Sequence, residues 1–128
     1  FSEIKKEFET SIILITHNMG LVEQICDKTL VLYAGRIMEY GHTKDIFLKP
    51  SHPYTRGLLE AIPRIDQEYE TLKTIPGEPP NMFEKTSGCV FSSRCQNPTH
   101  DCRQGNIPMK LVEISKGHWV DQCCSKCG

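Results

Sequence analysis

The cysteines of this 128-residue chain lie almost entirely in its second half, and this distribution limits what the chain can fold into. Six of the seven Cys and six of the eight Pro follow Ile62, whereas the continuous aliphatic runs precede it. An odd number of Cys cannot be consumed by internal disulfides, and seven is a high count for the reducing cytosol. We therefore expect two segments, residues 1–62 with an apolar core and residues 63–128 held by bound metal.

Charge balance and the length of the apolar runs exclude two classes of protein. Lys and Arg number 15 against 16 Asp and Glu, which is untypical of a protein that neutralises nucleic-acid phosphates. The longest apolar stretch, residues 12–15, is far shorter than the roughly 20 residues of a membrane-spanning helix, and no secretory leader is visible. We expect a cytosolic chain without a nucleic-acid partner.

The first segment has the pattern of the end of an α/β domain. The last part of an amphipathic helix is predicted at the start of the chain, because apolar side chains recur there at helical spacing, at Phe1, Ile4 and Phe8. Residues 12–15 are apolar at every position, which is typical of a strand covered on both faces in a parallel sheet, and Asn18 is expected to cap the helix that follows. Such a strand needs neighbours, so we expect the chain to begin inside a larger domain.

A hairpin is predicted next. Residues 29–33 and 36–40 read as two strands around a tight turn, with Ile37 buried and Glu39 in solvent. The hairpin is expected to lie at the end of a sheet.

Two short helices should follow the hairpin. Thr43 can cap a helix over residues 44–48, and Pro53 suits the first turn of a second helix, which Pro63 ends. From residue 64 onward the chain has turn signals and scattered apolar residues with little periodicity. Apolar burial alone is therefore not expected to hold the second segment.

His17 directly follows the aliphatic stretch, at the carboxyl end of the expected strand, where open α/β sheets place their ligands. Taken alone, a His at this position is more often an ordinary turn residue. The surrounding residues favour a functional role, because they carry a family resemblance.

The sequence around His17 is similar to the end of the nucleotide-binding subunit of an ABC transporter. The resemblance is carried by Ser11-Ile-Ile-Leu-Ile-Thr-His-Asn-Met-Gly20, residues 27–31, Tyr33-Ala-Gly-Arg-Ile37 and Glu39-Tyr-Gly41. It implies that His17 is the family's switch histidine, which contacts the γ-phosphate of ATP and helps to align the attacking water. An imidazole suits this role as a hydrogen-bond donor to an oxygen whose charge changes during phosphoryl transfer. Asn18 stands where the family commonly has Asp.

No G-x-x-x-x-G-K-[ST] phosphate loop and no family signature string occur in the sequence. The resemblance therefore implies a fragment whose phosphate-binding and Mg²⁺-binding parts lie upstream of Phe1. The expected fold class is α/β, the C-terminal part of a P-loop ABC ATPase core followed by an irregular, cysteine-rich extension. We expect ATP hydrolysis in the parent subunit and none in this chain alone.

The second segment narrows the resemblance to the oligopeptide and dipeptide importer ATPases, a family that nickel importers share. The strings that carry it are Asp45-Ile-Phe, His52-Pro-Tyr-Thr-Arg-Gly-Leu-Leu-Glu-Ala-Ile-Pro63, Ile75-Pro-Gly-Glu-Pro-Pro80 and Gly88-Cys-Val-Phe-Ser-Ser-Arg-Cys95. The resemblance implies an ATPase subunit that powers peptide import, with a second ATPase subunit and transmembrane permease subunits as partners. Its expected location is peripheral, on the cytoplasmic face of the cell membrane.

Six thiols of the second segment are candidate metal ligands, namely Cys89, Cys95, Cys102, Cys123, Cys124 and Cys127. Four thiolates suffice for zinc or for an iron–sulfur cluster. Structural zinc generally uses pairs spaced C-x₂₋₄-C, so the wider spacing of the first three Cys favours an iron–sulfur centre.

The family resemblance implies a [4Fe-4S] cluster held by three Cys of the extension and one near the end of the chain. The predicted ligands are Cys89, Cys95, Cys102 and Cys123, with Cys124 and then Cys127 as rivals for the fourth position.

Other interpretations stay open. The thiols can be reduced, buried apolar residues, or the chain can be a stand-alone interaction module stabilised by zinc, with His100 as a further candidate zinc ligand. A redox enzyme that uses the Cys124-x-x-Cys127 pair is a third alternative. We expect His52, His100 and His118 to be most simply turn or surface residues. Arg94 has two open alternatives, as a donor to a cluster sulfur or a carboxylate and as a solvated side chain.

Overall fold

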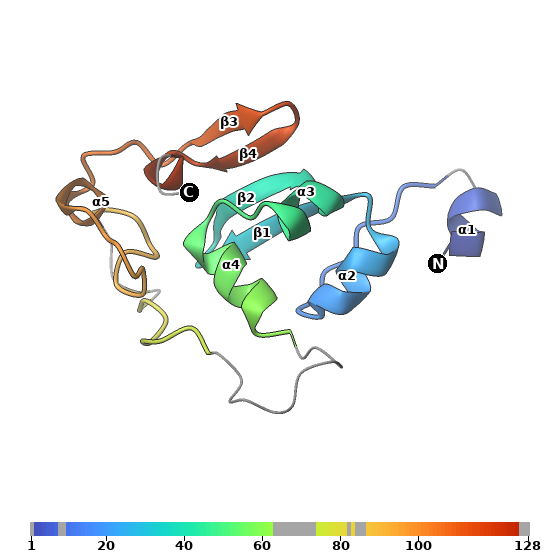
Figure 1. Ribbon diagram of the computed structural model, residues 1–128, viewed down its shortest axis with the longest axis horizontal. Helices are drawn as coiled ribbons and strands as arrows, with labels where there is room; N and C mark the ends of the chain where they lie inside the picture. The colour runs from blue at the N-terminus through green and yellow to red at the C-terminus, as the bar shows by residue number, and fades with distance from the viewer. Residues whose placement is uncertain (1, 8–9, 63–73, 82, 84–86, 126–128) are drawn as a thin grey trace.

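Four strands form one antiparallel sheet in the computed structural model, which describes residues 2–7, 10–62, 74–81, 83 and 87–125 (Figure 1). The strand order is β1-β2-β4-β3, and each neighbouring pair is antiparallel. The strands are β1 (Lys28–Tyr33), β2 (Arg36–His42), β3 (Leu111–Ser115) and β4 (His118–Asp121). Two hairpins that are far apart in the sequence thus meet where β2 pairs with β4.

The predicted first hairpin is confirmed. Ala34 and Gly35 connect its strands, with φ angles of 47° and 75°. Positive φ at both residues is what a two-residue turn needs if its twist is to match that of the strands. Side chains of β1 alternate between a buried and an exposed face. Leu30 and Leu32 lie on the exposed face, with 45% and 57% of their surface in solvent.

The prediction that Glu39 faces solvent is wrong, because its exposed fraction is 0%. The first hairpin does lie at one end of the sheet, with β1 at the edge, but β4 pairs with β2 on the side opposite β1, so Glu39 lies in a central strand. The residues before the fourth helix also contact its carboxylate. The prediction of an exposed Glu39 therefore fails because later segments of the chain cover this part of β2.

The predicted Asn18 cap and the predicted position of Pro53 are confirmed, whereas the Thr43 cap is corrected. The Leu21 amide donates to Asn18 Oδ1 over 3.1 Å at the start of α2 (Met19–Ile25), and Pro53 begins α4 (Pro53–Glu60). Thr43 does not cap α3 (Thr43–Leu48), because it is the first helical residue. Its hydroxyl instead lies 2.8 Å from that of Thr29, and both side chains are buried. Pro63 lies outside the described residues.

Residues 12–15 do not form the predicted strand. Ile13 and Ile15 are 92% and 93% exposed, and the segment leads from α1 (Ser2–Glu7) to α2 without pairing to the sheet in the described part of the chain (Figure 1). An all-apolar strand is stable only between two covered faces. Here Leu14 is partly covered, but the face that carries Ile13 and Ile15 stays in solvent, so the pattern is not realised.

The second segment is more regular than predicted. It contains α5 (His100–Gln104), the β3–β4 hairpin and the short 3-10 helix η1 (Gln122–Cys124). Its buried side chains pack with those of the first hairpin in one core, which includes Tyr33, Met38, Phe91 and Val120. The helices α3 and α4 lie beside β1 and β2 (Figure 1). Helix α5 lies beyond the end of the β1–β2 hairpin that carries its turn (Figure 1). Among the described residues, the helices are all too short and too polar to cross a bilayer.

Candidate functional site

Four of the six candidate thiols are buried in the core that the two hairpins share. They are Cys89, Cys102, Cys123 and Cys124, called the buried thiols below. Three separate pieces of chain supply them: the turn after Gly88, helix α5 and helix η1. The fold thus brings together thiols that the sequence separates by up to 35 positions, from 89 to 124.

Short polar contacts hold α5 against the turn that contains Cys89. Thr99 caps α5, and its hydroxyl lies 3.2 Å from the Cys102 amide and 2.9 Å from the Cys102 sulfur. The Cys89 amide donates to the Cys102 carbonyl over 2.7 Å. Gly88 permits this approach, because a Cβ there would overlap the same carbonyl oxygen. Residues 88, 89 and 102 are therefore fixed relative to one another by the backbone.

The buried thiols differ in acidity. The Cys123 sulfur lies 2.8 Å from the Cys102 sulfur and donates to it. Burial raises the pKa of Cys102, but hydrogen bonds from Cys123 and Thr99 outweigh burial and leave that pKa below its ordinary value. Burial and the donated hydrogen bond both raise the pKa of Cys123, and burial raises that of Cys89. Among Cys89, Cys102 and Cys123, Cys102 is thus the sulfur that most readily becomes a thiolate.

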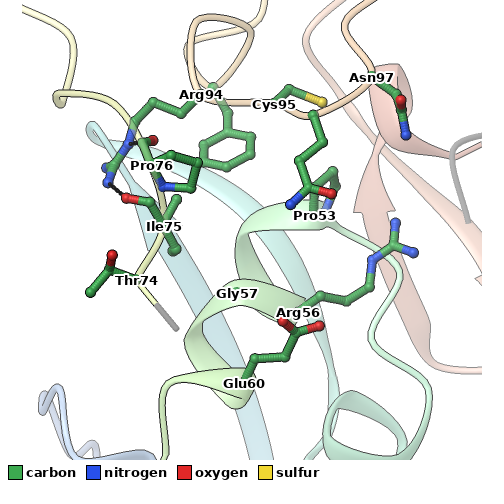
Figure 2. Close-up of a pocket in the computed structure, with 12 residues that line it drawn as sticks. Pro53, Arg56, Gly57, Glu60, Thr74, Ile75, Pro76, Arg94, Cys95 and Asn97 are labelled. Atoms are coloured by element: carbon green, nitrogen blue, oxygen red, sulfur yellow. Dashed lines mark hydrogen bonds between the residues drawn. The ribbon is translucent and has the colours of Figure 1, made fainter. Parts of the chain in front are cut away.

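Cys95 lies apart from the other predicted ligands, half-buried at a cavity of about 260 Å³ (Figure 2). Helix α4, the segment 74–76 and the loop 91–97 form the walls of this cavity. Gly57 of α4 lies close to Ile75, since a Cβ at this position would come within 2.7 Å of the Ile75 side chain. The side chain of Cys95 packs against the edge of the shared core.

Arg94 is not a simply solvated side chain. It holds the cavity wall in place. Its guanidinium donates to the carbonyls of Ile75 and Pro76 over 2.9 and 3.1 Å (Figure 2) and to the Tyr33 hydroxyl over 3.4 Å. The same group lies 5.9 Å from the centre of the Tyr33 ring. Arg94 therefore links three segments, and none of its hydrogen bonds in the described structure goes to a sulfur.

A buried polar network, which sequence reasoning missed, lies between β2 and the second hairpin. Glu39 Oε1 accepts from the Ser51 amide over 2.8 Å and lies 2.6 Å from His118 Nε2, while Oε2 accepts from the His52 amide over 2.9 Å. We call these four residues the Glu39 network. His52 and His118 are 0% and 3% exposed, so the prediction that they are turn or surface residues is wrong.

His52 is buried as a neutral imidazole. Its Nδ1 accepts from the Tyr54 amide over 3.0 Å, so the single proton of the neutral ring belongs on Nε2, which is buried and has no described partner. Burial, with a smaller contribution from Arg56, lowers the pKa of His52 to about 4. A sequence signal for this role exists, because a residue before a helix-starting Pro occupies the cap position.

The remaining predicted site residues lie away from the shared core. His17 is exposed at the bend between residues 10–16 and α2, and His100 is exposed on α5. Cys127 lies outside the described residues. Within the described part of the chain, no three side chains of the His, Cys, Asp and Glu types are arranged to hold a single metal ion.

These features define a mixed helix-and-strand unit in which a cysteine-bearing extension completes a small sheet. The family described as "Oligopeptide/dipeptide transporter, C-terminal region" matches residues 38–102. This chain belongs to that family. The resemblance to oligopeptide and dipeptide importer ATPases is confirmed, and nothing found supports the alternative of a stand-alone zinc module.

Named relatives agree with this assignment. The chain is 51% identical to the oligopeptide transport ATP-binding protein OppD of Haemophilus influenzae over 91% of its own length and 35% of that protein. It is 54% identical to OppD of Escherichia coli over 79% of its length and 30% of that protein. The dipeptide transport ATP-binding protein DppD of Bacillus subtilis is 47% identical over 76% of this chain and 29% of its own length. The chain thus spans about a third of these relatives.

Proposed function

We propose that this chain is the C-terminal part of an ATP-hydrolysing subunit that powers the import of oligopeptides or dipeptides. The family match carries this proposal, together with relatives whose names describe ATP-binding proteins of peptide transport. Residues 1–62 would belong to the nucleotide-binding domain and residues 63–128 to its extension. ATP and Mg²⁺ would bind the complete subunit.

Exposed apolar side chains support a larger parent domain. Ile13 and Ile15 project from a segment that pairs with no described strand, and Leu30 and Leu32 cover the open face of β1. Exposing these side chains in one small unit is unfavourable, whereas a preceding part of the domain could cover them. In such a domain residues 12–15 would regain the two covered faces that their sequence requires.

His17 is the proposed switch histidine of that domain. Its imidazole is accessible at the end of the exposed segment, where a nucleotide bound by the rest of the subunit could approach. The ring would donate a hydrogen bond to a γ-phosphate oxygen and orient the attacking water, which lowers the barrier by positioning and electrostatic stabilisation.

Replacing His17 by Ala in the complete subunit, assembled with its transporter partners, tests this role. We expect ATP turnover to fall by about 10²-fold or more, because one preorganised transition-state donor is lost. His100→Ala, which removes an exposed imidazole from the extension, is the matched control and should leave turnover unchanged. Full turnover in the His17 variant would exclude the assignment.

The proposed partners follow from the same family. A second ATPase subunit would pair with this one around ATP, and transmembrane permease subunits would bind the pair at the cytoplasmic face of the membrane. Co-purification of the complete subunit with the permease tests this arrangement, and a subunit that sediments with membranes in the absence of permease would contradict it.

We also propose that the extension carries a [4Fe-4S] cluster held by Cys89, Cys95, Cys102 and Cys123. The donor set fits such a centre in its chemistry, because three of these thiols share one buried core and Cys95 packs against its edge. A bound cluster would join the three segments through iron–thiolate bonds and supply a one-electron redox centre. The protein's own part is to gather the thiols and to exclude water from them.

Metal content decides this second proposal. Complete subunit purified without oxygen should absorb in the visible range and contain about four irons and four sulfides, from the stoichiometry of the cluster. Cys102→Ser should lose both, whereas Cys26→Ser, at the end of α2 and outside the shared core, should keep them. One zinc per chain, without iron, would contradict the cluster and favour zinc.

A further inference from the structure

The Glu39 carboxylate receives more hydrogen bonds than any neutral replacement could accept in the same place. Two donors reach Oε1, from Ser51 and His118, and a third reaches Oε2, from His52. A Gln side chain has one carbonyl oxygen and one NH₂ group, so in either orientation its NH₂ would face a donor. This fully buried site therefore requires an acceptor at both oxygens.

Among these contacts, the one to His118 joins the first hairpin to the second. The backbone ladder between β2 and β4 is short, with the Cα partners Glu39 with Val120 and Tyr40 with Trp119. Gly41 lets the second hairpin approach, because a Cβ there would come within 3.3 Å of the Gly117 carbonyl and 3.4 Å of the His118 Cα. With so few backbone pairs, the register depends on which side chains are buried, namely Val120 and the Glu39–His118 contact.

A chain of contacts leads from His118 to the buried thiols. Strand β4 begins at His118 and ends at Asp121, whose Oδ1 accepts from the Cys123 amide over 2.9 Å. The Gln122 amide donates to the Lys110 carbonyl over 2.8 Å and fixes the same turn to the start of β3. Cys123 then lies 2.8 Å from Cys102, sulfur to sulfur. A one-residue slip of β4 would shift the strand by about 3.3 Å and reverse its faces, and would displace the turn at Asp121 that holds Cys123.

We propose that Glu39 and His118 are positioning residues, whose contact sets β4 on β2 and so places Cys123 beside Cys102. Neither residue contacts a thiol in the described structure, and both act through β4. The placement of the two thiols is a property of the protein alone. Its consequence for metal binding rests on the [4Fe-4S] cluster proposed above.

Phenylarsine oxide is a suitable probe, because it reports two neighbouring thiols without any iron. Two thiols each form a bond to arsenic, and the oxide oxygen leaves as water with the two thiol protons. The complete subunit, freed of metal and kept reduced, is titrated with the probe, and peptide mapping by mass spectrometry locates the product. We expect one arsenic bridging Cys102 and Cys123 in the unaltered subunit.

Paired variants separate positioning from a general loss of structure. His118→Gln keeps an N–H donor near the position of Nε2, whereas His118→Leu keeps a buried side chain without a donor. We expect affinity for the probe to fall at least tenfold in His118→Leu and in Glu39→Gln and to stay within twofold in His118→Gln. Glu113→Gln, in the same hairpin at an exposed position that bonds Gly117, is the matched control and should not change it. Circular dichroism checks that each variant is folded.

The results distinguish this proposal from that of the cluster. Unchanged probe binding in folded His118→Leu would overturn the positioning role, and so would an equal loss in His118→Gln. If Glu39→Gln fails to fold, the His118 pair alone decides the question. A subunit that shows the expected probe pattern but never contains iron would sustain the positioning role and refute the cluster.

Discussion

The two hairpins of the sheet have similar lengths but are held in different ways. In the first, side chains alternate along β1 between core and surface, and six pairs of residues join its strands. In the second, residues 113–115 of β3 are exposed, and four pairs join its strands. The first hairpin therefore depends mainly on apolar alternation, whereas in the second the apolar contacts of Val120 are joined by the Glu39 network and by contacts around the buried thiols.

This difference predicts that the two hairpins respond differently to changes in charge and in the state of the thiols. A hairpin stabilised by apolar burial is insensitive to changes in charge or to the state of its thiols. One held by a buried carboxylate and by sulfur chemistry responds to both, because an unpaired buried polar group is costly.

Gly88→Ala should severely disrupt the packing around the buried thiols. The added Cβ would overlap the Cys102 carbonyl oxygen, and backbone atoms on both sides cannot yield, so we expect a loss of about 4 kcal/mol in the free energy of unfolding. Gly35→Ala in the turn of the first hairpin meets open space and should cost about 1 kcal/mol, from its positive φ alone. Urea unfolding followed by circular dichroism measures both, and equal losses would refute the close approach.

Acid should lower the free energy of unfolding through His52, which precedes α4 and belongs to the Glu39 network. Its pKa is about 4 in the folded chain and 6.5 when unfolded, so between these values the unfolded state binds more protons. The stabilisation is complete above pH 6.5 and is lost as the pH falls toward 4, by about 3 kcal/mol.

His52→Asn provides the comparison for this pH effect, because an Asn oxygen can still accept from the Tyr54 amide as a cap. The free energy of unfolding of the unaltered chain should decline more steeply between pH 6.5 and 4 than that of the variant. Parallel curves would show that His52 is not buried as a neutral ring.

A pair of identical substitutions compares the apolar contributions of the two hairpins. Val31→Ala in β1 removes methyl groups from a side chain that is 5% exposed and should cost about 2 kcal/mol. Val112→Ala in β3 alters a half-buried side chain and should cost about half as much. Urea denaturation compares the two variants, and an equal or larger loss at Val112 would contradict the proposed division between the hairpins.

The sequence predicted the parts of the fold in which local rules suffice. The first hairpin, the Asn18 cap and the start of α4 each depend on residues within a few positions of one another. The strand expected at residues 12–15 failed because its neighbours are not among the described elements. Periodicity can specify what a segment needs, but another part of the protein must supply it.

The cysteines of the candidate site could be predicted from the sequence, but the buried contacts that position them could not. Cysteine spacing identified six candidate thiols, four of which the fold gathers in the shared core. The partnership of Glu39 with His118 links positions 79 residues apart, and no local pattern marks it. A Glu in an apparent edge strand and a His before a Trp each fit the surface when considered alone. Their burial follows only from the pairing of β4 with β2.

A double-mutant cycle between Glu39 and His118 tests most directly whether a buried polar contact holds the second hairpin on the first. Unfolding free energies are compared for the unaltered chain, Glu39→Gln, His118→Leu and the double variant, each within the complete subunit and at one pH. We predict a coupling energy of at least about 1.5 kcal/mol, as for a buried hydrogen bond to a charged group. Strictly additive losses would show that the two side chains act independently and would contradict the account.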